Sequence, residues 1–304
     1  MEYIRETLNF KIENPTAITL GKFDGLHRGH ELLMDNLMKI SKEENLKSVA
    51  FTFDMAPTYI VANKEPEVLT TNEEKYYIFE KTGLDYLIEC PFTKEVMNME
   101  PEKFIKWLVN DINVRYFVVG NDFHFGHNRK GDYHVLKKFA AKYGYKVLVL
   151  DKMQDEHRDI SSTYIREEVV KGNIKKVNEL LGYDFFVKSV IIHGNQIGRT
   201  VGIPTINMSL PKEKLLPPKG VYVTTVLLDD KTYRGVTNIG NKPTISENNP
   251  LGVETFILDF SQDVYGKEAV VSFHDFVRPE MKFDSLEKLK EQMERDVEFA
   301  RKWS

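Results

Sequence analysis

The hydrophobic pattern of the chain changes near residue 182, and this change constrains the fold more than any other feature. Before it, short apolar strand-like segments alternate with segments whose apolar residues recur at helical spacing. Strands separated by helices of this length predict a parallel sheet with right-handed crossovers. The expected strands are residues 17–20, 48–53, 86–89, 116–119 and 146–150, and the expected helices are residues 31–38, 73–82, 101–109, 134–143, 163–171 and 174–181.

After residue 182, short apolar segments are divided by turns rich in Gly, Pro, Asn and Asp, which is typical of an antiparallel β domain. A charged amphipathic helix over residues 285–302 ends the chain. We therefore expect an α/β domain over residues 1–184 and a β domain over residues 185–304. The expected strands of the second domain are residues 187–192, 220–228, 232–237, 253–259 and 269–276.

Composition narrows the class of protein. The net charge of −4 and the pI near 6.1 argue against a nucleic-acid-binding surface. No apolar run approaches the ~18 residues of a membrane-spanning helix, and the N-terminus lacks a basic region followed by an apolar core. The single cysteine, Cys90, excludes an intrachain disulfide and fits a reducing compartment. We expect a cytoplasmic protein that binds neither nucleic acid nor membrane, whose oligomeric state the sequence leaves open.

Residues 21–30, Gly-Lys-Phe-Asp-Gly-Leu-His-Arg-Gly-His, lie between an expected strand and an expected helix. The glycines allow backbone N–H groups and a helix N-terminus to approach a phosphate. His27 and His30, at i and i+3, can share one face and donate to the same anion. A zinc site is the weaker alternative, because no third ligand lies nearby. The third alternative is a purely structural turn.

Two further segments of the first domain carry polar and aromatic residues. Residues 120–132 follow the strand 116–119, so they should lie at the carboxyl edge of the sheet, where aromatic rings could stack on a flat ligand. An ordinary surface loop is the alternative. Residues 161–166, Ser-Ser-Thr-Tyr-Ile-Arg, put three hydroxyls and a guanidinium at a helix start, which suits either a polyphosphate or simple helix capping.

The second domain begins with a glycine-rich segment, residues 193–207. Gly194, Gly198 and Gly202 allow the backbone to wrap a phosphate, although their spacing is not that of a Walker loop. Thr205 and Asn207 alternate on an extended chain, so both side-chain oxygens can point to one metal ion. A glycine-rich hairpin without a ligand is the alternative.

The three segments of the first domain together resemble the adenylyltransferase half of the bacterial bifunctional riboflavin kinase/FAD synthetase family. Its Gly-x-Phe-Asp-Gly-x-His-x-Gly-His, Gly-x-(Asp/Asn)-Phe-x-Phe-Gly-x-x-Arg-x-Gly and Ser-Ser-Thr-x-Ile-Arg motifs match in order and spacing. The resemblance implies a Rossmann-like nucleotidyltransferase domain. It implies catalytic His27, His30 and Arg166, an ATP site of Gly21, Phe23, Gly25, Gly29, Ser161, Ser162 and Thr163, and a flavin site of Asp122, Phe123, Phe125 and Arg129.

The second domain resembles the riboflavin kinase half of the same family, through its Gly-x-x-x-Gly-Arg-x-x-Gly-x-Pro-Thr-Ala-Asn signature and the segments Asn-Ile-Gly-x-x-Pro-Thr and Arg-x-Glu-x-Lys-Phe. The resemblance implies a six-stranded antiparallel barrel with a C-terminal helix, and Glu254 as the catalytic base. It implies an ATP site of Gly194, Gly198, Arg199, Gly202, Pro204 and Asn238, a flavin site of Arg278, Glu280 and Phe283, and Mg²⁺ ligands Thr205 and Asn207.

The resemblance implies two consecutive ATP-dependent reactions, riboflavin to FMN and then FMN to FAD with release of pyrophosphate. Three departures from the family pattern bear on this expectation. Ala56 replaces a usual histidine, Ile206 replaces the alanine of Pro-Thr-Ala-Asn, and His124 and His127 stand where arginines are common. Two alternatives therefore stay open: only one activity is retained, or the chain is a flavin-binding regulator with inactive sites.

Overall fold

The computed structural model describes residues 1–54, 67–194, 202–241 and 251–303. The chain forms two compact units, Met1–Ser162 and Thr163–Ser304, each of which is described by itself. Three residues that the sequence analysis singled out, Ala56, Gly198 and Arg199, lie outside the described residues.

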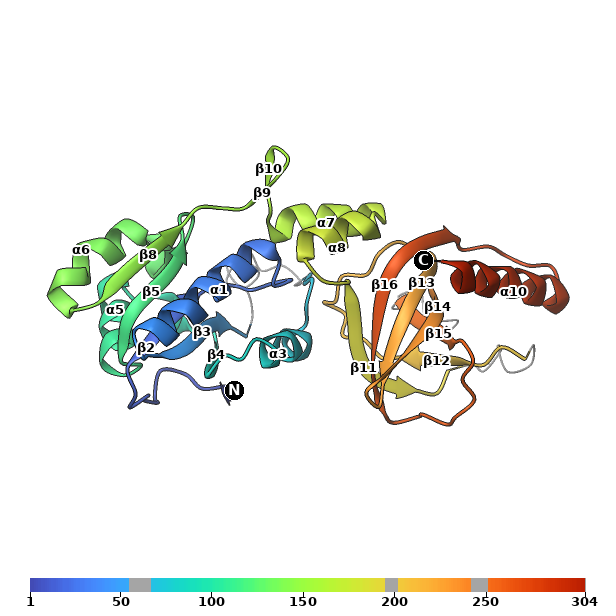
Figure 1. Cartoon of the computed structure of the whole chain (residues 1–304), viewed down its shortest axis with the longest axis horizontal. Coiled ribbons are helices and arrows are strands. Elements are labelled where there is room, and N and C mark those ends of the chain that lie inside the picture. The colour runs from blue at the N-terminus through green and yellow to red at the C-terminus, as the bar shows by residue number, and fades with distance from the viewer. Residues whose placement is uncertain (55–66, 195–201, 242–250, 304) are drawn as a thin grey trace. The chain divides into compact units, whose positions relative to one another are not determined.

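A parallel sheet forms the centre of the first unit (Figure 1). Its strands lie in the order β1-β4-β3-β2-β5-β8, and each neighbouring pair is parallel, as predicted. The strands are β1 (Glu2–Ile4), β2 (Thr16–Leu20), β3 (Lys47–Phe53), β4 (Tyr86–Cys90), β5 (Val114–Gly120) and β8 (Lys146–Leu150). The edge strand β1 was not predicted, because its three residues are too few to show a hydrophobic pattern.

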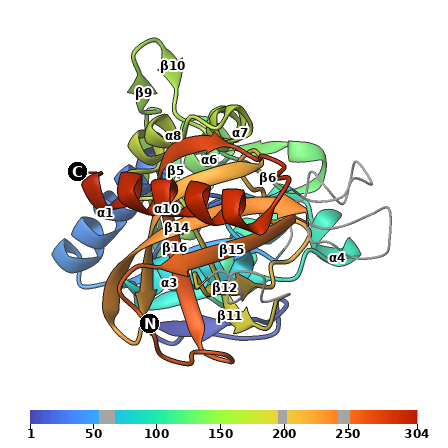
Figure 2. The ribbon, with the colours of Figure 1, turned by 90° about the vertical axis from the view of Figure 1, so that its right-hand side faces the viewer.

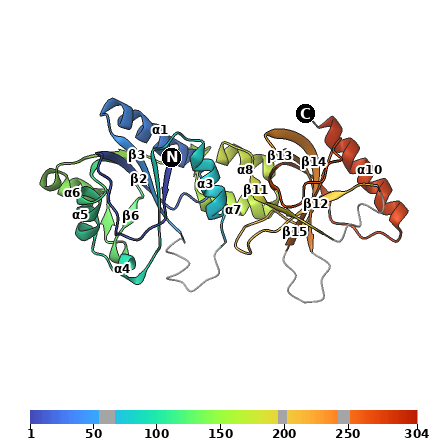
Figure 3. The same cartoon turned by 90° about the horizontal axis from the view of Figure 1, so that it is seen from below.

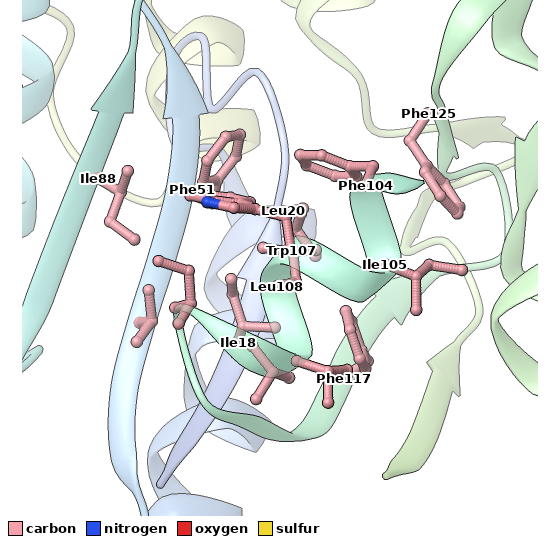
Figure 4. Close-up of a cluster of buried hydrophobic side chains, with 14 of the residues drawn as sticks. Ile18, Leu20, Phe51, Ile88, Phe104, Ile105, Trp107, Leu108, Phe117 and Phe125 are labelled. Atoms are coloured by element: carbon pink, nitrogen blue, oxygen red, sulfur yellow. The ribbon is translucent and has the colours of Figure 1, made fainter. Parts of the chain in front are cut away.

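Helices cover both faces of this sheet (Figure 3). Ile18 and Phe117 belong to the cluster that includes α5 and α6, whereas Ala17 and Val118, on the opposite face, pack with α1 and α3. Figure 4 shows the first cluster, in which Phe104 of α5 packs among the strand residues. The helices are α1 (Arg28–Glu43), α3 (Asn72–Glu80), α4 (Lys94–Met97), α5 (Pro101–Asn110) and α6 (Tyr133–Tyr143).

The order of the strands reverses at β2. The chain moves outward from β2 through β3 and β4 on one side, and from β5 to β8 on the other. Open α/β sheets bind ligands at this reversal, outside the carboxyl ends of the strands. The segments that leave those ends are residues 21–27 after β2 and residues 121–132 after β5. Two of the predicted motifs therefore lie at the reversal.

Helix α1 is longer than the sequence predicted, since it extends from Arg28 to Glu43 rather than over residues 31–38. His27 is its N-cap residue, with an extended backbone, and its carbonyl accepts hydrogen bonds from the N–H groups of His30 and Glu31. His30 thus lies in the first turn of the helix rather than in the preceding loop. The early start was hidden by Gly29, which has a low helix propensity.

The second unit contains a closed six-stranded barrel, which confirms the predicted architecture. The strand order around the barrel is β11-β12-β15-β14-β13-β16, and every pair is antiparallel. The strands are β11 (Phe186–Ile192), β12 (Thr205–Met208), β13 (Gly220–Leu228), β14 (Lys231–Asn241), β15 (Leu251–Ile257) and β16 (Glu268–Pro279). The sequence pattern gave five of these strands, and β12 was expected only as an extended segment.

Among the described residues, the helices that accompany the barrel are α7 (Ser162–Lys171), α8 (Ile174–Leu181) and α10 (Leu286–Lys302). The side chain of Asn178 in α8 donates to the carbonyl of Phe273 in β16 at 2.9 Å. Helix α10 lies against β14 on the outside of the barrel (Figure 2). By these contacts the compact units divide after Ser162, ahead of the boundary at residue 184 that the sequence suggested. Where the functional halves divide stays a prediction.

Candidate active sites

The turn between β2 and α1 has a left-handed backbone. Phe23, Gly25 and Leu26 have φ angles of 47°, 84° and 34°. This region costs a residue with a Cβ ~1–2 kcal/mol, so something must hold the two non-glycine residues there. Both of their side chains are buried, Phe23 completely. The turn therefore folds back onto the core before the chain enters α1, whose N-terminal N–H groups can bind an anion.

The other two glycines of the motif allow close packing. A Cβ on Gly21 would lie 3.0 Å from the Phe23 ring, and one on Gly29 would lie 3.2 Å from the His27 ring. Both distances are tighter than ordinary carbon contacts, so a larger residue at either position would displace an aromatic ring. The glycines thus keep His27 and Phe23 in place.

His27 and His30 are stacked, with ring centroids 3.8 Å apart and planes inclined by 23°. Both Nδ1 atoms are buried and have no hydrogen-bond partner among the described residues. Burial lowers the pKa of His27 to about 4. Burial and then the neighbouring His27 lower the pKa of His30 well below its usual value. Both imidazoles are therefore neutral at pH 7, each with one N–H donor.

The loop that follows β5 approaches the same site. The negative charge of Asp122 acts on His27 and raises its pKa, although less than burial lowers it. The Asp122 carboxylate also pairs with the ammonium of Lys152 at 3.1 Å. The N–H of Asn121 donates to the carbonyl of Leu150 at the end of β8. The segments after β2, β5 and β8 thus converge at the carboxyl edge of the sheet.

The aromatic residues of this loop differ in exposure. Phe125, in the short strand β6 (His124–Phe125), is buried in the core against Phe104, with ring centroids 5.9 Å apart. Phe123 is half-buried and stacks on Phe125 at 5.3 Å. Arg129, with a φ of 58°, is exposed. Of the predicted flavin contacts, the structure therefore leaves Asp122, Phe123 and Arg129 accessible, while Phe125 supports Phe123 from below.

The hydroxyl-rich segment lies at the start of α7. The Ser162 hydroxyl donates to the carbonyl of Asp24 at 2.8 Å, so it fastens the turn that contains the histidines. Ser161 is half-buried and Thr163 is exposed. Arg166 lies one turn further along α7 and is half-buried. Ser162 thus has a structural role besides the predicted contact with ATP.

In the barrel, three predicted site residues form a row across neighbouring strands. Asn207 of β12 lies directly opposite Glu254 of β15, which lies directly opposite Asn238 of β14. Directly opposed side chains point to the same face of a sheet, with Cβ atoms ~4.5–5.5 Å apart. The adjacent residues Thr237 and Thr255 point to the other face, inside the barrel, where their hydroxyls are 2.8 Å apart and fully buried. The row therefore lies on the outer face of the barrel.

Thr205 lies on the same face as Asn207, two residues along β12. The hydroxyl of Thr205, the amide oxygen of Asn207 and the carboxylate of Glu254 are hard oxygen donors, which is the donor set that Mg²⁺ prefers. No group of three or more His, Cys, Asp or Glu side chains in the described ranges is arranged to hold a metal. The residues present therefore fit a Mg²⁺ ion that is shared with nucleotide phosphates.

Two positions in the second unit require glycine because a neighbouring side chain occupies the space where a Cβ would lie. A Cβ on Gly194 would overlap the side-chain amide of Asn207, and one on Gly240 would overlap the carboxylate of Glu280. Gly194 thus lies directly over Asn207, and Glu280 lies beside the strand that carries Asn238. Gly202, with a φ of 82°, and Pro204 are exposed in the segment that leads into β12.

Arg278 was predicted to bind flavin, and the structure shows that it also anchors α10. Its Nε and Nη2 atoms donate to the buried carboxylate of Asp296, the shortest distance being 2.6 Å. The ring of Phe283 lies 6.0 Å from the Arg278 guanidinium. Asp296 was not predicted as a site residue, because it is one of many charged residues in the helix sequence. Lys152, between β8 and β9 (Gln154–Asp155), was missed because nothing in the sequence distinguishes it from the many other lysines.

The fold and the two sites define the class of protein. The first unit is a Rossmann-like domain with a nucleotidyltransferase-type histidine turn at its strand reversal, and the second is a barrel with one carboxylate and two side-chain amides in one row. Sequence models of the FAD synthetase family match residues 9–164, and those of the riboflavin kinase family match residues 181–304. The chain belongs to the family of bifunctional riboflavin kinases/FMN adenylyltransferases and has both of its domains.

Relatives with that description cover nearly the whole chain. The protein of Listeria monocytogenes is 33% identical over 94% of this chain and 91% of its own length. That of Escherichia coli K12 is 34% identical over 94% of this chain and 92% of its own length. A Streptococcus pneumoniae crystal structure, described as a macrolide-efflux protein, has 29% identity and a TM-score of 0.88, and covers 100% of this chain and 99% of its own. In the described part of the present chain, no helix is long and apolar enough to cross a membrane.

Proposed function

We propose that the barrel phosphorylates riboflavin to FMN and that the sheet domain then adenylylates FMN to FAD. The observation that carries this proposal is the row Asn207–Glu254–Asn238, because it unites a base and polar ligands from three separate strands. The stacked histidines at the strand reversal support the second reaction, because they bring two imidazole donors together at the edge where such sheets bind ligands.

In the kinase reaction, Glu254 accepts the proton of the ribityl 5′-hydroxyl as that oxygen attacks the γ-phosphorus of ATP. Thr205 and Asn207 would hold a Mg²⁺ ion, which would supply neutralisation of the charge on the transferred phosphoryl group. Asn238, on the other side of Glu254, contributes to the ATP site with Gly194, Gly198, Arg199, Gly202 and Pro204. Glu280, Phe283 and Arg278 bind the flavin. FMN and ADP are the products.

In the adenylyltransferase reaction, the FMN phosphate attacks the α-phosphorus of a second ATP molecule and pyrophosphate leaves. No general base is needed, because the attacking phosphate is already ionised at neutral pH. His27 and His30 donate N–H groups to the ATP phosphates, and the N-terminus of α1 adds its partial positive charge. Arg166 neutralises charge on the departing pyrophosphate, with the hydroxyls of Ser161 and Thr163. Phe123 and Asp122 contact the isoalloxazine ring.

The partners in this proposal are riboflavin, FMN, ATP and a divalent ion, with no nucleic acid and no membrane. The net charge of −4 supports the absence of a nucleic-acid partner. Cys90, the one cysteine of the sequence, is a buried free thiol whose pKa burial raises to about 12. An unreactive thiol of this kind is compatible with the cytoplasm, where we propose that the protein works.

Chromatographic analysis of the flavins formed from riboflavin, ATP and Mg²⁺ tests the proposal. The wild-type chain should form FMN first and FAD later. The Glu254→Gln variant should not phosphorylate riboflavin at a measurable rate, because the amide cannot accept the hydroxyl proton, yet it should still convert supplied FMN to FAD. Phosphorylation by this variant at the wild-type rate would disprove the role of Glu254. Flavin binding without turnover of ATP by the wild type would indicate a regulator instead.

A further inference from the structure

The left-handed turn before α1 is held by residues that lie outside the histidine motif. One carboxylate oxygen of Asp24 accepts hydrogen bonds from the backbone N–H groups of Leu69, at 2.8 Å, and Thr70, at 3.1 Å. In return, the hydroxyl of Thr70 accepts a hydrogen bond from the N–H of Gly25 at 3.0 Å. Asp24 and Thr70 are both buried. The two segments are thus joined reciprocally, in what we call the 24–70 clasp (Asp24, Gly25, Leu69 and Thr70).

We propose that Thr70 and Asp24 are positioning residues for the adenylylation of FMN, because the clasp fixes the phosphate-binding turn in its left-handed conformation before ATP binds. The clasp holds the turn at Gly25, between the two strained residues Phe23 and Leu26. Leu26 is followed directly by His27. A turn that relaxed toward ordinary φ angles would therefore rotate the histidine pair away from its stacked arrangement.

The residues that follow Leu69 and Thr70 are held by their own hydrogen bonds, so this side of the clasp can impose a conformation on the turn. Thr71 is the N-cap of α3, and its hydroxyl accepts from the N–H of Glu74 at 3.1 Å. The Glu74 carboxylate accepts from the N–H of Thr71 at 2.9 Å, which completes a capping box. Phe79 of the same helix packs edge-on against Phe23, with centroids 5.4 Å apart. Helix α3 thus contacts the turn both through the clasp and through the core.

A buried cation accompanies the buried Asp24 carboxylate. Lys75 of α3 is buried, and its ammonium donates to the side chain of Asn72 at 3.3 Å. Burial lowers the pKa of Lys75, and the carboxylates of Glu89, Asp24 and Asp54 raise it in opposition. The positive charge of Lys75 thus acts on the Asp24 carboxylate, and charge-assisted hydrogen bonds from N–H groups to a carboxylate are stronger than those to a neutral acceptor.

The test compares Thr70→Val with Thr70→Ser in the full-length chain, and it rests on the proposed adenylyltransferase function. Valine has nearly the shape of threonine but removes the acceptor of the Gly25 N–H. We expect kcat/KM for ATP in FMN adenylylation to fall about tenfold to a hundredfold, with KM for ATP raised and kcat lowered. Serine keeps the hydroxyl and should restore most of the activity. Riboflavin kinase activity, measured on the same samples, should be unchanged.

Thr82→Val is the matched control, since its hydroxyl donates to the carbonyl of Phe79 at the other end of α3, without contact to the clasp. It should leave adenylylation unchanged. Hydrogen exchange at Gly25 and Leu26 in the ligand-free proteins gives a readout independent of activity, and Thr70→Val should accelerate it. Wild-type kinetics and wild-type exchange in Thr70→Val would overturn the inference. A wild-type chain that forms no FAD would overturn the proposed function. The exchange data would still show whether the Thr70 hydroxyl restrains the turn at Gly25 and Leu26.

Discussion

At the scale of single residues, the histidine pair combines burial with unused hydrogen-bonding capacity. Neutral His27 and His30 carry no charge that must be desolvated, and each offers one N–H donor. A ligand that supplies negative charge would favour protonation of the pair, because an anion within hydrogen-bonding distance raises a histidine pKa. The histidines are therefore uncharged in the ligand-free protein, and in the proposed reaction a bound polyphosphate would favour their protonation. This arrangement has a consequence for stability that can be measured.

We predict that the first unit is less stable in acid because of His27. Its pKa falls from 6.5 to about 4 on folding, which is worth about 3 kcal/mol. Between these values the unfolded state binds more protons, so this stabilisation is complete above pH 6.5 and is lost as the pH falls toward 4. The urea midpoint should therefore decrease from pH 7.5 to pH 5, and it should decrease less in His27→Asn.

The fluorescence of Trp107, which is buried in the first unit, reports this transition in a Trp303→Phe background that is common to all samples. Groups remote from the site act equally on both proteins, and because His27 also lowers the pKa of His30, the difference between them reports the titration of the histidine pair. An equal decrease in His27→Asn would show that His27 is already protonated in the folded state at pH 5.

At the scale of elements, α10 is attached to the barrel by a buried ion pair. Arg278 at the end of β16 binds Asp296, which also accepts from Gln292 at 3.0 Å. The segment between β16 and α10 contains Glu280 and Phe283, the proposed flavin contacts. The ion pair closes this segment into a loop whose two ends are fixed. Its position relative to the row on β12, β15 and β14 thus depends on α10.

We predict that Asp296→Asn lowers both stability and flavin affinity of the kinase. Removing one charge of a buried pair leaves the other uncompensated, which typically costs ~3–5 kcal/mol. KM for riboflavin should rise, whereas conversion of supplied FMN to FAD should not change. Glu298→Gln is the control on the same helix, because its pair with Lys302 is exposed and should contribute little. Equal melting temperatures for Asp296→Asn and Glu298→Gln would contradict the prediction.

Helices and strands were predictable from the sequence where their hydrophobic patterns extend over enough residues. Strands β2 to β5 and β8, and the amphipathic helices, follow from hydrophobic spacing, which local sequence determines. Strand β12 has only four residues and follows Pro204, so nothing local distinguishes it from a loop; pairing with β15 makes it a strand. Likewise, α1 begins earlier than its apolar pattern because the His27 carbonyl accepts the first helical hydrogen bonds.

At the scale of the whole molecule, the site residues differ in how far the sequence could place them. The histidine pair lies within four residues, so its proximity was predictable from helical spacing. Asn207, Asn238 and Glu254 are separated by long stretches of chain, and only the barrel register aligns them. The partnership of Asp24 with Thr70 has no local signal at all, because it spans 46 residues. Contacts between residues far apart in the chain leave no local pattern, so a single sequence does not predict them.

In the proposed function the adenylyltransferase site and the kinase site belong to different halves of the chain, so each should be separable by substitution. The His27→Asn/His30→Asn double variant should lose FAD synthesis by a factor of about 100 or more, because it removes donors that stabilise charge in the transition state. The barrel residues are untouched, so the variant should phosphorylate riboflavin normally and accumulate FMN. Chromatography of flavins over time measures both rates in one sample. Loss of both activities at an unchanged melting temperature would contradict separate sites, since it would mean that the kinase reaction also depends on the histidine turn.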